Sequence, residues 1–127
     1  MPDYVRKTLD RLQYTKPKRP QYEPHRWSVP AYGKIPQMAP DSDESNILDK
    51  EATKRTQYIV GTMIYYARSL DPTMLREISE ILRVQSQPTR DTAEKEKMLL
   101  DYAATYPNEI LRYKARDMVL HIDSDAA

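Results

Sequence analysis

Hydrophobic side chains recur at helical spacing through residues 48–107. Three stretches in this region each place apolar residues along one face of a helix, the pattern of an amphipathic helix that packs on a core. The stripes comprise Ile59, Val60, Met63, Ile64, Ala67 and Leu70; then Met74, Leu75, Ile78, Ile81 and Leu82; then Leu99, Tyr102 and Ala103 within about 91–106. The pattern therefore predicts three core helices.

Local signals suggest where these helices begin and how closely they pack. Asp71 can cap the second helix, and Pro72 suits its first position. Asp91 with Glu94 resembles a capping box for the third helix. Gly61 lies inside the first helix, where glycine costs about 1 kcal/mol relative to alanine. We expect Gly61 to allow another backbone to come close.

The first 14 residues predict a further, short helix. Val5, Leu9 and Leu12 are spaced along one helical face, and Pro2 and Asp3 open the segment. A helix of this length is not stable alone in water. It therefore needs a surface on which to pack.

Residues 15–47 predict a proline-rich, basic strap. Six of the ten prolines lie between Pro17 and Pro40, and each fixes φ and removes a backbone donor. Interleaved apolar residues, among them Tyr22 and Trp27, indicate an extended segment that lies over a surface. The composition also predicts partial disorder when the segment is isolated.

The period changes to alternation in residues 108–127. EILRYKA and MVLHIDSD read as two strands joined by Arg116 and Asp117, which predicts a β-hairpin. Such a hairpin is marginal unless it packs on helices or on further strands. The expected fold class is thus mainly α with a terminal β-hairpin, an α+β arrangement.

Charge is distributed unevenly. Residues 1–40 carry eight Lys or Arg against three acids, a net charge of +5, whereas the remainder carries twelve against sixteen, or −4. Cysteine is absent, which excludes disulfides, thiolate metal sites and a cysteine nucleophile. No apolar run is long enough to span a bilayer and no signal peptide opens the chain. We expect an intracellular protein, cytoplasmic by default, with a nuclear location left open.

The strap combines cations with aromatic rings, as nucleic-acid-binding segments do. Phosphates attract lysine and arginine, and bases stack on aromatic side chains. The candidate binding residues are Lys16, Lys18, Arg19, Tyr22, Arg26 and Trp27. The alternative is a basic strap that only keeps the protein in solution.

Two carboxylates end the last predicted strand. Asp123 and Asp125 lie two residues apart and so share one face of a strand. A two-metal phosphodiester site needs several carboxylates from different elements, which one strand cannot supply. From spacing alone, a solvated acidic strand end is the simpler interpretation.

Several segments, in order, resemble the carboxy-terminal part of a copia-type retrotransposon reverse transcriptase and its junction with ribonuclease H. They are MPDYV, PHRW, VGTMIYYAR (Val60–Arg68), KMLLDYAATYP and HIDSDAA. Residues 1–14 resemble the thumb region, residues 48–107 the connection region, and residues 108–127 the first strands of ribonuclease H. The resemblance covers nearly the whole chain, and the order and spacing of the segments carry it.

The resemblance implies a role for Asp125, which matches the first metal-binding aspartate of the ribonuclease H site. Asp125 would thus be a catalytic residue and Mg²⁺ ligand of an incomplete site, with no tight Mg²⁺ binding expected in this chain. Asp3 replaces the glycine usual in the family, which places a negative charge where a phosphate backbone passes.

The leading hypothesis is a truncated fragment of a retroelement polyprotein, not an enzyme by itself. The parent would carry out RNA-directed DNA synthesis and degrade RNA in RNA–DNA hybrids. The expected partners are the rest of the polyprotein and an RNA–DNA hybrid or single-stranded nucleic acid, with no membrane. The alternatives are a non-catalytic nucleic-acid-binding piece, whose affinity should fall with salt, and a helical interaction module without nucleic acid.

Overall fold

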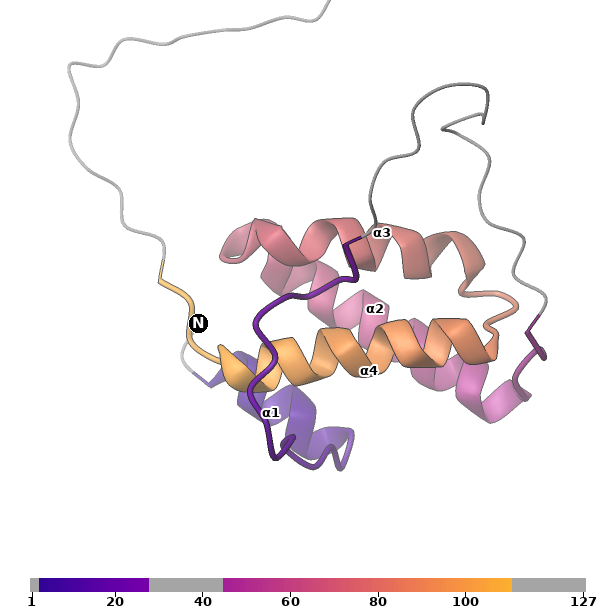
Figure 1. Ribbon diagram of the computed structural model, residues 1–127, viewed down its shortest axis with the longest axis horizontal. Coiled ribbons are helices and arrows are strands. Elements are labelled where there is room, and N and C mark those ends of the chain that lie inside the picture. Colours follow the sequence, from indigo (N-terminus) through magenta and orange to yellow (C-terminus); the bar gives the residue numbers. More distant parts are fainter. Residues whose placement is uncertain (1–2, 28–44, 111–127) are drawn as a thin grey trace, which may run out of the picture.

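The structure, a computed structural model, describes residues 3–27 and 45–110 and is mainly helical there (Figure 1). The elements are α1 (Tyr4–Arg11), α2 (Lys50–Ser69), the short 3-10 helix η1 (Pro72–Met74), α3 (Leu75–Val84) and α4 (Arg90–Thr105). The short leading helix and the three core helices predicted from hydrophobic spacing are confirmed.

The predicted terminal β-hairpin and its incomplete ribonuclease H-like sheet are not seen. Residues 111–127 lie outside the described ranges, and residues 108–110 form no strand. Within the described ranges there is no sheet, and an isolated antiparallel bridge joins Ile47 to Thr89. The structure therefore shows the helical part of the predicted fold only.

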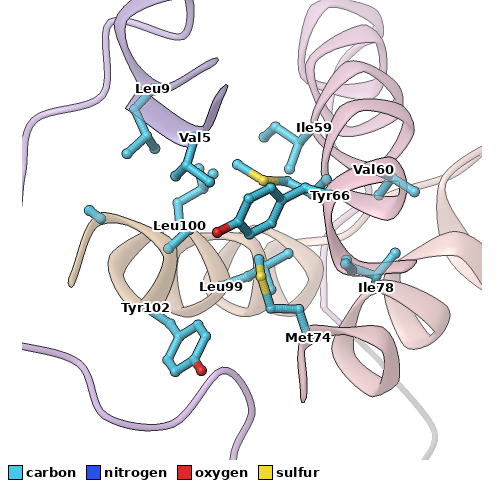
Figure 2. Packing of buried hydrophobic residues seen from close by; sticks show 14 of the residues in the cluster. Val5, Leu9, Ile59, Val60, Tyr66, Met74, Ile78, Leu99, Leu100 and Tyr102 are labelled. Carbon is cyan, nitrogen blue, oxygen red and sulfur yellow. The ribbon is translucent and has the colours of Figure 1, made fainter. Parts of the chain in front are cut away.

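The core lies where the apolar faces of the four α-helices meet (Figure 2). Helix α1 contacts α2 and α4, and α3 also packs against both of these helices. The predicted stripes supply this core, with Ile64, Leu70, Leu75 and Leu82 partly buried at its edge. A fully buried aliphatic or aromatic side chain contributes about 1.5–3 kcal/mol. The largest fully buried hydrophobic side chains of this core are Tyr66, Ile59, Met63, Met74, Ile78, Ile81, Leu99, Leu100, Val5 and Val60.

Helix α1 is held by burial and by one tyrosine at its start. Val5 and Leu9 are buried among the core helices. The Tyr4 hydroxyl donates to the Thr62 carbonyl at 3.1 Å. The Tyr4 ring stacks on that of Tyr66, with centroids 5.9 Å apart and planes 6° apart. These contacts provide the packing surface that a helix of this length requires.

The ends of α1 differ from the prediction. Asp3 occupies the N-cap position, but its φ of 63° is left-handed and its carboxylate accepts no capping hydrogen bond. The carboxylate instead pairs with Arg6 at 2.6 Å. Gln13 also has a left-handed φ, of 52°, which is incompatible with a continuing helix. The helix is therefore shorter than residues 1–14.

The turn between α2 and α3 follows the prediction in part, because Asp71 caps the 3-10 helix η1, whereas α3 itself begins at Leu75 with Met74 at its N-cap. The Asp71 carboxylate accepts from the Thr73 backbone N–H at 3.2 Å, and Pro72 is the first residue of η1. The Thr73 hydroxyl also lies 3.0 Å from the Tyr102 hydroxyl of α4. This cap therefore connects the α2–α3 turn to α4 as well.

The start of α4 was predicted wrongly. The capping box is formed by Thr89 and Thr92, not by Asp91 and Glu94. The Thr89 hydroxyl accepts from the Thr92 N–H at 3.3 Å, and the Thr92 hydroxyl accepts from the Thr89 N–H at 3.1 Å. Thr89 has the extended backbone that an N-cap needs, whereas Asp91 is already inside the helix.

The expected role of Gly61 is also wrong. Gly61 is exposed, and a Cβ built on it would have no neighbouring atom within 4 Å. No other backbone in the described residues comes close enough to require glycine there. Gly61 therefore costs helix stability without a packing reason on this surface.

We predict that Gly61→Ala stabilises the protein by about 0.5–1 kcal/mol, because alanine restricts the unfolded chain and fits the open helix surface. Urea unfolding followed by circular dichroism measures the change. Ala67→Gly is the matched control, since Ala67 is a buried residue of the same helix and its replacement should destabilise by a similar amount or more. A destabilised Gly61→Ala protein would contradict the open surface.

Candidate nucleic-acid interface

The described part of the strap, residues 15–27, runs across α4 (Figure 1). The Gln21 N–H donates to the Thr105 hydroxyl at 3.0 Å, near the end of α4. The Arg26 guanidinium pairs with Glu94 at 3.2 Å, near the start of α4. Pro24, between these two contacts, is buried. Side chains of α4 thus fix the path of the strap.

A charged hydrogen-bond network precedes the strap. The Tyr14 hydroxyl donates to one carboxylate oxygen of Asp101, and the Lys97 ammonium donates to the other at 2.7 Å. Asp101 is buried. Burial, and then the hydrogen bond to Asp101, raise the pKa of Tyr14 well above its ordinary value. Tyr14 therefore stays a neutral donor at physiological pH and fixes where the strap begins.

The predicted binding residues lie along this strap, and most of them face solvent. Lys16, Lys18 and Arg19 are exposed, and none of them forms an ion pair with another described residue. Tyr22 is 69% exposed and Trp27 is 66% exposed. These five side chains are therefore available to a partner.

Arg26 differs from the other predicted residues. Its side chain is 73% exposed, but its guanidinium is engaged by Glu94. A surface ion pair of this kind is worth about 0–1 kcal/mol and weakens with salt. Arg26 therefore makes a weak contact between the strap and α4, and Glu94 offsets part of its charge.

The electrostatics of the strap favour an anionic partner. Residues 15–27 contain four Lys or Arg and one acid, Glu23, a net charge of +3. Proteins that bind single strands combine such cations, which follow the phosphates, with aromatic rings on which bases stack. Exposed Tyr22 and Trp27 supply the rings. The strap has both components on a segment fixed to a helix.

Sequence reasoning missed the residues that hold the strap. The sequence pattern predicts a helix-capping role for Glu94 and indicates no role for Tyr14, Asp101 or Thr105. One signal was present: Asp101 stands between the inward-facing Leu100 and Tyr102, where an unpaired carboxylate would be costly. An acid in that position therefore indicates that a hydrogen-bond donor from another segment lies beside it.

The predicted metal ligand cannot be placed. Asp125 lies outside the described residues, as does its neighbour Asp123. In residues 3–27 and 45–110 no group of three or more His, Cys, Asp or Glu is arranged to hold a metal ion. The described ranges also contain no helix both long and apolar enough to cross a membrane.

Comparison with known protein families, curated proteins and solved structures finds no match to this chain.

We predict that Tyr14→Phe destabilises the protein by about 1–3 kcal/mol, because it removes a hydrogen bond to a buried carboxylate. Tyr22→Phe is the matched control, since the Tyr22 side chain is exposed and its hydroxyl loss should change stability by less than about 0.5 kcal/mol. Urea unfolding of the two variants measures the difference. Equal effects would mean that the Tyr14–Asp101 contact does not fix the strap.

Proposed function

We propose that the chain is a non-catalytic, nucleic-acid-contacting part of a copia-type retroelement polyprotein. Its parent would carry out RNA-directed DNA synthesis and degrade the RNA of RNA–DNA hybrids. The observation that carries the nucleic-acid role is the exposed set of cations and rings on a strap fixed to α4. An intracellular location is part of the same proposal.

The helical unit gives support to the retroelement origin. The segment VGTMIYYAR falls within α2, and KMLLDYAATYP falls largely within α4. The two helices contact each other, and both contribute to the core. Two of the resembling segments are therefore parts of one packed structure, as expected for the connection region of such a polyprotein.

The environment of Asp3 bears on the nucleic-acid role. In the family that this chain resembles, a glycine is usual at this position, and an acid there would repel a phosphate backbone. The carboxylate of Asp3 pairs with Arg6 at 2.6 Å, which offsets part of its charge. This pairing reduces the repulsion, and α1 stays compatible with a nearby strand.

The proposal assigns no catalysis to the chain itself. Cleavage of an RNA–DNA hybrid by two metal ions needs several carboxylates that converge from different elements. The resemblance supplies one of them, Asp125. Asp125 would become a Mg²⁺ ligand only together with the remaining carboxylates of a whole ribonuclease H domain.

We predict that single-stranded nucleic acid binds the chain in a salt-dependent manner. A variant with Lys16, Lys18 and Arg19 replaced by glutamine should bind more weakly, and its slope of log affinity against log salt should be shallower by about 2. Fluorescence anisotropy of a labelled oligonucleotide at several salt concentrations measures both.

The control removes the same charge elsewhere. Lys50, Lys54 and Arg68 are exposed residues of α2, and their replacement by glutamine should change the slope much less. Equal loss in the two triple variants would show that only net charge matters. Affinity that is indifferent to salt would exclude the strap as a phosphate-binding segment.

The retroelement origin has a separate test, which is to read the transcript and genomic DNA on both sides of this reading frame. We expect a Tyr-x-Asp-Asp motif encoded upstream and further ribonuclease H carboxylates encoded downstream. Flanks that encode neither motif would contradict the origin and leave the nucleic-acid role to the binding experiment.

A further inference from the structure

A cavity of about 280 Å³ lies between the first half of α2, the middle of α4 and Tyr14. This volume is close to the lower end of the range for small-molecule pockets, roughly 300–1,000 Å³. Leu48, Ala52 and Leu100 supply apolar wall, Arg55 and Lys97 supply positive charge, and Glu96 supplies an acidic group. Tyr14 and Lys97 also donate to Asp101, so the cavity adjoins the point where the strap begins.

Glu96 is the unusual member of this lining. The residue is 7% exposed, and its Oε1 atom is buried without a hydrogen-bond partner. Burial raises the pKa of Glu96, while the Thr56 hydroxyl and the Arg55 charge act in the opposite direction. A buried acceptor that lacks a donor costs free energy. A ligand that brings N–H groups would relieve this cost.

Arg55 restricts the kind of donor that fits. Its side chain is exposed and lines the cavity together with Tyr14 and Glu96. An ammonium ligand would meet this positive charge as well as the carboxylate. A neutral group with N–H donors, joined to an anion that reaches Arg55, avoids the repulsion. A nucleotide has this combination, together with a flat ring for the apolar walls.

Among the bases, guanine matches a carboxylate best. Its pairing edge has an imino N–H beside an amino group, and both N–H groups can donate to Oε1, the oxygen of Glu96 that has no partner. Uracil and thymine flank their single N–H with carbonyl oxygens, which a carboxylate repels. Adenine and cytosine offer an amino group beside an acceptor nitrogen. An unpartnered carboxylate oxygen such as Glu96 Oε1 therefore favours guanine over the other bases.

We propose that this cavity binds guanine nucleotides, with the Glu96 carboxylate accepting from the base and Arg55 contacting the phosphate. The proposal builds on the proposed function, because Tyr14 lines the cavity and the first strap cation, Lys16, follows two residues later. A strand that follows the strap would present its bases close to the cavity. A guanine at that place would add sequence preference to a binding mode that otherwise reads only phosphate and rings.

Calorimetric titration of the full chain with GMP, AMP, CMP and UMP at low salt tests the proposal. We expect GMP to bind about tenfold or more tightly than UMP, and Glu96→Gln to remove that preference. Glu51→Gln, the same change at an exposed position of α2, should leave it unchanged. Arg55→Gln should weaken GMP binding but not guanosine binding. Equal affinity for GMP and UMP, or GMP binding unchanged in Glu96→Gln, would overturn the proposal.

Two further measurements keep the test decisive. Ala52→Leu leaves Glu96 intact and narrows the cavity, so it should also abolish GMP binding even if Glu96→Gln fails to fold. A thymine-only oligonucleotide reports on the strap alone. Salt-dependent binding of that strand without GMP preference would overturn the cavity proposal and leave the proposed function standing. GMP binding that depends on Glu96, without binding of the thymine strand, would support the cavity proposal and contradict the nucleic-acid role of the strap.

Discussion

The structure depends on the docking of α1 against α2 and α4. An eight-residue helix gains too little from its own hydrogen bonds, so the burial of Val5 and Leu9 and the stacking of Tyr4 on Tyr66 hold it in place. The position of α1 in turn sets the position of Tyr14, which reaches Asp101 on α4. The path of the strap is therefore a consequence of how one short helix is buried.

Much of the helical fold is predictable because periodicity reflects burial. The stripe that contains Ile59 and Met63, and the one that contains Ile78, were assigned from spacing and are buried. Helix starts were less predictable, since several residues compete to cap. Asp71 does cap, but Thr89 precedes Asp91 and takes the N-cap position at α4. Asp71 and Asp91 carry the same local capping signal, an acid near a predicted helix start. Thr89, rather than Asp91, is the N-cap of α4 because Thr89 has the extended backbone conformation.

The residue types of the candidate interface were predictable from the sequence, but the contacts that hold the strap on α4 were not. Exposed lysines and rings in a proline-rich segment follow from local sequence, because such segments bury little. The contacts that fix the segment join residues far apart, with Tyr14 and Asp101 separated by 87 positions and Gln21 and Thr105 by 84. The unpartnered oxygen of Glu96 was equally unpredictable from local sequence, because it arises from how α2 and α4 pack around the side chain.

The side chain of Tyr66 contacts both edges of the helical unit. Its ring stacks on Tyr4, and its hydroxyl accepts from the Glu109 N–H at 3.0 Å. The polypeptide therefore enters and leaves the bundle beside one residue. A unit whose two ends are neighbours can be inserted into a longer chain at little cost in loop entropy. The helical bundle therefore has the geometry of a side branch of a chain rather than of a spacer between two distant points.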